Sequence, residues 1–139
     1  CFVNIVEEME LNLYPESQRS VLFDLLSYAN KIELNRLVLT THSPYVINYL
    51  TLAAKAFLLT QKISANETLQ ERIKEVVPAD SAIDPARLRI YELKDGGVFR
   101  LSTYEGLPSD ENFLNIQLGV TNELFDQLLE IEQEFDYKN

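Results

Sequence analysis

Two adjacent acids and one histidine are the residues of this sequence whose types and positions could do chemistry together. Glu7 and Glu8 follow a short apolar run, and His42 stands in a Thr-Thr-His-Ser-Pro segment that follows a second apolar run. One carboxylate can bind a hard cation such as Mg²⁺, a second can orient and activate an attacking water, and an imidazole can contact developing negative charge. Phosphoryl transfer needs these three tasks, because it depends on positioning and charge stabilisation more than on covalent chemistry.

Two predicted strands and a helix must hold these side chains. The runs 2–6 and 37–39 are mostly apolar, as is typical of strands buried in a parallel sheet. Between them, Pro15 suits the first turn of a helix. The apolar positions of this helix fall on one face: Val21, Leu22, Leu25, Leu26 and Ala29. The pattern predicts a parallel β-α-β unit and an α/β fold.

The same pattern predicts where the acids and the histidine lie. Parallel strands end at one edge of a sheet, so we expect Glu7, Glu8 and His42 to cluster there. Neighbouring residues of an extended strand point in different directions. The two acids could therefore divide cation binding and water activation between them.

The remaining sequence predicts helices and one hairpin. Ser43 is expected to cap a helix over 44–57, and further helices are predicted for 66–77 and 121–135. Two alternating arms over 87–103 flank a turn with a Gly-Gly pair, which is typical of a β-hairpin. No helix directly follows these glycines, so they do not suggest a phosphate-binding turn.

The order of these motifs resembles the second half of an ABC-type ATPase core. Over residues 2–48 the sequence is similar to the family of overcoming-lysogenization-defect nucleases and related stand-alone AAA-like ATPases. The resemblance implies a partial P-loop NTPase core whose first strand is the Walker B strand. It further implies that Glu7 is the Mg²⁺-binding acid, Glu8 the acid that activates water, and His42 the switch histidine at the γ-phosphate.

Three positions depart from the family's usual residues. Met9 stands where proline is frequent, Tyr14 where histidine is common before Pro15, and Glu7 where most ABC proteins have aspartate. These departures loosen the assignment to a subfamily more than they affect the mechanism.

The sequence lacks the other half of such a site. Neither a Gly-x-x-x-x-Gly-Lys-Ser/Thr loop nor an ABC signature motif occurs in it, and both are expected upstream of Cys1. We therefore expect residues 1–139 to form the C-terminal part of one ATPase domain, with the β-α-β region in 1–60 and the later helix, hairpin and C-terminal helix in 61–139. The fragment is expected to be inactive. By the resemblance, its parent binds ATP and Mg²⁺, hydrolyses ATP and forms a homodimer through the ATPase core.

Other interpretations compete with this one. Two acids at a strand end are often only solvated, and a single histidine is often a capping or core residue. A second hypothesis is a degenerate ATPase lobe for dimerisation or partner docking, and a third is an ATPase linked to metal-dependent nuclease function, with Glu7, Glu8 and His42 as ligands. The motifs in this order favour the ATPase. Glu10 suggests only solvation or local hydrogen bonding.

Composition narrows the partners and the location. The net charge is −10 and the 12 Lys and Arg residues form no basic stripe, which disfavours direct nucleic-acid binding. Cys1 is the only cysteine, as fits a reducing cytoplasm. The longest apolar stretch, 46–60, is interrupted by Asn48 and Lys55 and is too short for a membrane span.

Overall fold

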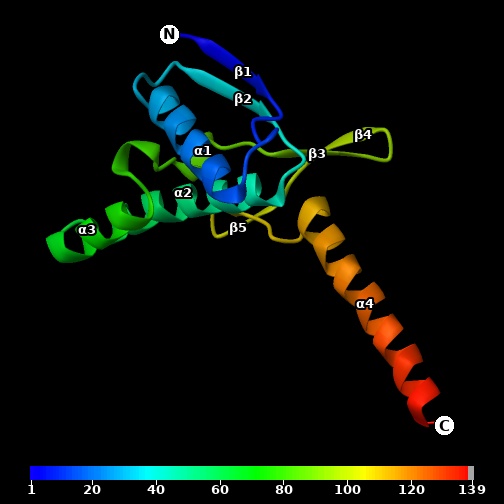
Figure 1. Cartoon of the computed structure of the whole chain (residues 1–139). Helices are drawn as coiled ribbons and strands as arrows, with labels where there is room; N and C mark the ends of the chain where they lie inside the picture. The colour runs from blue at the N-terminus through cyan, green and yellow to red at the C-terminus, as the bar shows by residue number, and fades with distance from the viewer. Residues whose placement is uncertain (138–139) are drawn as a thin grey trace. The chain divides into compact units, whose positions relative to one another are not determined.

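The computed structural model describes residues 1–137, and the side chains of all of these except residues 134–136 (Figure 1). The last two residues of the predicted domain 1–139 lie outside the described residues. The contacts divide the chain into a first unit, Cys1–Ser109, and a second unit that begins at Asp110. All three predicted site residues belong to the first unit.

A two-stranded parallel sheet carries these residues. Strand β1 (Val3–Glu7) pairs with strand β2 (Arg36–Thr40), in a register that runs from Val3 opposite Arg36 to Glu7 opposite Thr40. Helix α1 (Pro15–Asn30) connects the two strands, which confirms the predicted parallel β-α-β unit. The fold is mixed α/β with a small parallel sheet, in agreement with the predicted α/β class.

One face of this sheet is open, so the expectation of two buried strands was wrong. Val3, Ile5 and Val38 lie on the open face and are 67%, 65% and 47% exposed. On the other face, Val6, Leu37 and Leu39 are partly buried and pack against the hydrophobic core. Apolar residues on both faces of a strand predict two covering layers, but α1 and its neighbours cover only one.

The core of the first unit lies between α1 and helix α2 (Pro44–Lys62), which pack against each other (Figure 1). Leu22 and Leu26 of α1 and Val46 and Leu50 of α2 are buried in it. Ser43 occupies the N-cap position of α2 but makes no side-chain capping bond. Its hydroxyl instead donates to Gln18 of α1, so the predicted cap is a contact between two helices.

Shorter elements complete the first unit. Helix α3 (Glu67–Val76) is capped by the Asn66 side chain, which accepts a hydrogen bond from the backbone N–H of Leu69. Two short 3₁₀ turns follow, at Ala79–Ser81 and Pro85–Arg87.

The predicted hairpin is present, and a second one follows it. The first pairs β3 (Tyr91–Lys94) with β4 (Gly97–Arg100). Its turn residues Asp95 and Gly96 both have positive φ angles, as a tight hairpin of this kind requires. The second, which the sequence did not indicate, pairs β5 (Thr103–Tyr104) with β6 (Leu107–Pro108).

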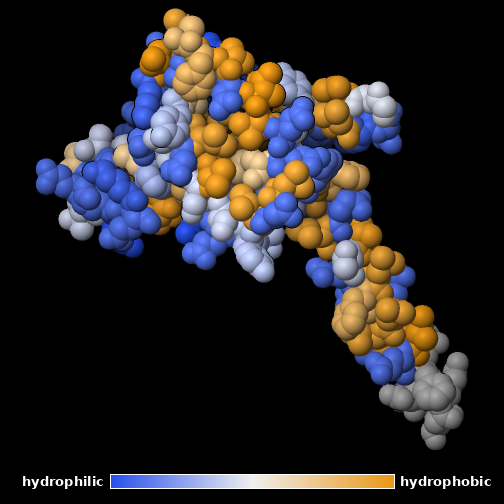
Figure 2. All heavy atoms as spheres, turned by 45° about the horizontal axis from the view of Figure 1, so that its top comes forward, coloured by the Kyte–Doolittle hydropathy of each residue, from blue (hydrophilic) through white to orange (hydrophobic). Residues whose placement is uncertain are grey.

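The second unit contains one long helix, α4 (Phe113–Tyr137), which begins well before the predicted range 121–135. The Asn112 side chain accepts a hydrogen bond from the backbone N–H of Asn115 at the start of this helix. Hydrophobic residues occupy much of the visible face of α4 in Figure 2. Even so, none of the helices in the described part of the chain is long and apolar enough to cross a membrane.

Two leucines test the position of the core. Leu22 is 0% exposed and Leu34 is 66% exposed. We expect Leu22→Ala to lower the free energy of unfolding by about 2 to 5 kcal/mol, because it leaves a cavity. We expect Leu34→Ala to change it by less than about 0.5 kcal/mol. Urea denaturation measures both, and equal losses would contradict this assignment of the core.

Candidate functional site

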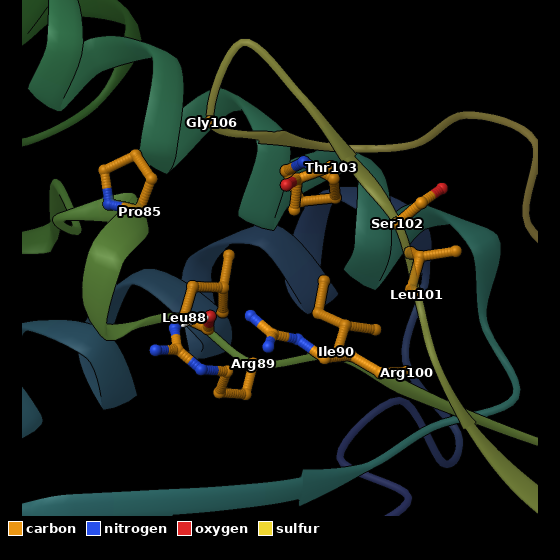
Figure 3. Close-up of a pocket in the computed structure, with 10 residues that line it drawn as sticks. Pro85, Leu88, Arg89, Ile90, Arg100, Leu101, Ser102, Thr103 and Gly106 are labelled. Atoms are coloured by element: carbon orange, nitrogen blue, oxygen red, sulfur yellow. Dashed lines mark hydrogen bonds between the residues drawn. The ribbon is translucent and has the colours of Figure 1, made fainter.

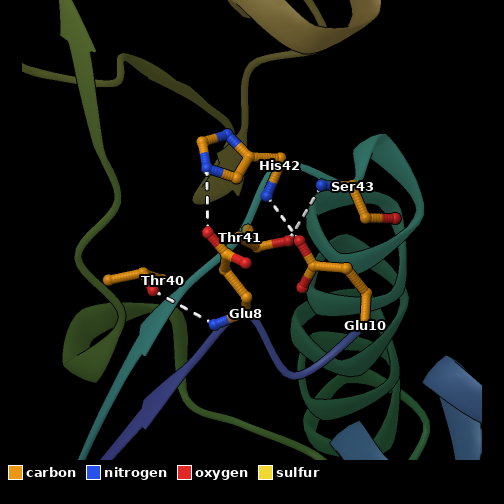
Figure 4. A network of polar contacts seen from close by, with 6 residues as sticks. All are labelled: Glu8, Glu10, Thr40, Thr41, His42 and Ser43. Atoms are coloured by element: carbon orange, nitrogen blue, oxygen red, sulfur yellow. Dashed lines mark hydrogen bonds and ion pairs between the residues drawn. The ribbon is translucent and has the colours of Figure 1, made fainter. Parts of the chain in front are cut away.

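The two strand ends bring Glu8 and His42 together. Glu8 directly follows β1, and His42 lies two residues beyond the end of β2. The Nε2 atom of His42 lies 3.4 Å from Oε1 of Glu8 (Figure 4). The side chains of His42 and Glu8 are 83% and 39% exposed, so both can be reached from solvent. The arrangement offers an acid and an imidazole side by side on an open edge.

Glu7 lies at the same edge but outside this contact. It is the last residue of β1, it pairs with Thr40 in the sheet register, and it is exposed. Its position follows the pleat, which puts it on the same open face as Ile5. The structure thus brings two of the three predicted residues into contact and leaves the third nearby, facing solvent.

The backbone of Glu8 explains why the two adjacent acids diverge. Glu8 has a φ angle of 46°, which is left-handed rather than extended. Its N–H donates to the backbone oxygen of Thr40 at 2.9 Å and to Thr40 Oγ1 at 3.2 Å. A non-glycine residue in this region costs about 1 kcal/mol or more. We expected an extended strand through both acids to make their side chains diverge, and this was wrong. The strand ends at Glu7, and the chain turns at Glu8 with a strained backbone.

Glu10 is the site residue that the sequence did not reveal. Its Oε1 accepts a hydrogen bond of 2.6 Å from the backbone N–H of His42 (Figure 4). Its Oε2 is buried and has no hydrogen-bond partner among the described residues. In the sequence, Glu10 is distinguished only by its closeness to the acid pair Glu7 and Glu8. Many solvated glutamates lie equally close to other acids.

Further hydrogen bonds connect the His42 turn to α1. The backbone N–H of Ser43 donates to Thr41 Oγ1 at 3.0 Å, and the Ser43 hydroxyl donates to Gln18 Oε1 at 2.7 Å. The amide of Gln18 in turn donates to the backbone oxygen of Leu13 at 3.0 Å. Because Gln18 and Ser43 are buried, the bond between their side chains is shielded from water.

The first unit has two hollows away from the exposed acid and histidine edge. A hollow beside the β5–β6 hairpin, lined by Pro85, Leu88 and Ile90 among others, measures about 10 Å³ and can hold no more than a water molecule (Figure 3). A larger hollow of about 340 Å³ is lined by residues such as Asn30 and Asp80. Neither hollow is lined by Glu7, Glu8 or His42.

Comparison with known proteins places the site in a family context. A family model described as "AAA domain, putative AbiEii toxin, Type IV TA system" matches residues 3–48, about a third of the chain. The match spans β1, α1, β2 and the start of α2. No curated protein and no solved structure matches the chain. The matched segment supports a P-loop ATPase-like family, and with it a nucleotide-binding, ATPase-like function and use of a nucleotide with Mg²⁺.

Glycine substitutions test the strained turn. Glycine adopts a left-handed backbone without strain but weakens an extended strand. We therefore expect Glu8→Gly to be less destabilising than Glu7→Gly, by about 1 kcal/mol. Denaturant titrations of the two variants make the comparison directly. Equal destabilisation would show that Glu8 is not held in a strained conformation.

Proposed function

We propose that this chain supplies one half of an ATP-hydrolysing site, in which Glu8 activates the attacking water and His42 contacts the γ-phosphate. The observation that carries the proposal is the 3.4 Å approach of Glu8 Oε1 to His42 Nε2, inside the segment that the AAA family model matches. A carboxylate is a suitable water-orienting base, and an imidazole is a suitable contact for a phosphate oxygen. Because both side chains are exposed, a nucleotide could reach them from solvent.

Glu7 fits the role of the Mg²⁺-binding acid in this proposal. Mg²⁺ is usually held by one or two carboxylates together with water and phosphate oxygens. Glu7 offers one exposed carboxylate at the edge where Glu8 and His42 lie, which matches this modest requirement. When bound, Mg²⁺ would neutralise charge that develops on the phosphate oxygens.

The phosphate-binding loop would come from another part of a longer parent protein. The sequence contains no such loop. The open sheet supports this view, because Val3, Ile5 and Val38 form an apolar face that a further layer would cover. Within the proposal, the parent is a cytoplasmic homodimer that joins two such cores, and the finer assignment to the overcoming-lysogenization-defect family belongs to the same proposal.

The isolated 139-residue chain is expected to bind ATP too weakly to measure and not to hydrolyse it. The backbone amides and lysine of a phosphate-binding loop supply much of the nucleotide affinity in P-loop proteins, and this chain lacks them. Isothermal titration calorimetry with ATP and Mg²⁺ tests this expectation. A micromolar affinity of the chain alone would contradict it.

In the full-length parent, Glu8→Gln is expected to lower ATP turnover by about 10²- to 10⁴-fold, because it removes a general base. This corresponds to about 3 to 5 kcal/mol of activation barrier. ATP binding should survive, so the variant should accumulate as an ATP-bound dimer in size-exclusion chromatography.

Glu7→Gln provides the matched comparison. It should weaken Mg²⁺ retention, and with it the productive nucleotide complex, so that added Mg²⁺ partly restores turnover. Unchanged turnover in Glu8→Gln would remove the catalytic role and favour a degenerate lobe that serves in partner docking.

A further inference from the structure

The turn that carries His42 is fixed by side-chain acceptors. β2 ends before this turn and α2 begins after it, so its backbone donors belong to neither element. The His42 N–H donates to Glu10 Oε1 at 2.6 Å, and the Ser43 N–H donates to Thr41 Oγ1 at 3.0 Å. A backbone donor outside regular structure donates to a side chain or to water, and a carboxylate makes a short, strong bond because it is charged.

Of these two bonds, only the one that Glu10 accepts joins separate parts of the chain. Thr41 lies within the turn itself, whereas Glu10 lies in the loop after β1, 32 residues from His42. A second link between the two strand ends runs from the Glu8 N–H to Thr40 and does not involve His42. Glu10 therefore links the His42 backbone to the loop that follows β1, and so to the segment that carries Glu8. The Ser43 hydroxyl links the same turn to α1 instead.

The shielding of one Glu10 oxygen favours a positioning role over direct chemistry. Oε1 is already engaged by the His42 N–H, and Oε2 is shielded from solvent. The shielded Oε2 cannot reach a water or a phosphate-bound cation in this arrangement, and Oε1 already accepts from the His42 N–H. A buried oxygen without a partner is also costly, which marks Glu10 as a residue that stability alone does not explain.

We propose that Glu10 is a positioning residue that holds the His42 turn in place so that the imidazole stays beside Glu8. This inference rests on the proposed function, since it concerns the same site. Its consequence is that Glu10 acts on turnover only through His42. Nucleotide affinity should not depend on it.

Three substitutions of Glu10 in the full-length protein distinguish the effect of side-chain length from the effect of its negative charge. Glu10→Ala removes the acceptor and should lower kcat by about tenfold or more, with the Kd for ATP unchanged within about twofold. Glu10→Gln keeps the reach and the acceptor without the charge, and should retain most of the turnover. Glu10→Asp keeps the charge but is one methylene shorter, and should resemble Glu10→Ala. Glu75→Ala, which removes an exposed acid of α3, is the control and should leave turnover unchanged.

The order of the two conservative variants decides the matter even if Glu10→Ala does not fold. A higher turnover of Glu10→Gln than of Glu10→Asp supports positioning through the hydrogen bond. A higher turnover of Glu10→Asp than of Glu10→Gln would show that the charge acts directly, and would overturn the proposal.

A double-mutant cycle with His42→Ala gives a readout that a general loss of stability would not move. If Glu10 acts through His42, Glu10→Gln and Glu10→Asp should differ in the wild-type background and be equal when His42 is alanine. The same difference in both backgrounds would overturn the proposal. If Glu8→Gln and His42→Ala both leave turnover unchanged, the proposed function fails and the positioning role fails with it. If those two lower turnover while Glu10→Asp does not, only the positioning role is overturned.

Discussion

The parallel pairing of β1 with β2 is the interaction on which the rest of the site depends. Its register places Glu7 opposite Thr40, so the loops after both strands leave the sheet at the same edge. A parallel pair requires a crossover, and α1 provides it while burying Leu22 and Leu26 in the core. Because the crossover helix is anchored in this way, residues 32 positions apart in the sequence come within hydrogen-bond distance.

Two residues at the edge of the sheet have energetically unfavourable features. Glu8 has a left-handed backbone, and one carboxylate oxygen of Glu10 is buried without a partner in the described residues. Both features cost free energy, which the core between α1 and α2 must offset. Such strain persists only where surrounding contacts hold the backbone in place. Here the hydrogen bonds from Glu8 to Thr40 and from His42 to Glu10 are such contacts.

Each unit also exposes hydrophobic surface. In the first unit this is the open face of the sheet, with Val3, Ile5 and Val38. In the second it is α4, where Leu124 and Leu128 are among several exposed large apolar residues. Contiguous apolar surface is commonly covered in the working form of a protein. For the sheet, this agrees with the proposal that another part of a parent protein completes the ATPase core.

The sequence by itself determined the β-α-β order and the presence of the helices, though not the start of α4, because periodicity and residues such as Pro15 and Pro44 act locally. It also predicted that Glu8 and His42 would meet, since parallel strands must end together. It could not predict the open sheet face, because an apolar strand looks the same whether one layer or two cover it. Only the tertiary structure decided the left-handed turn at Glu8 and the bond from His42 to Glu10. Both depend on distances between segments far apart in the chain, which no local pattern encodes.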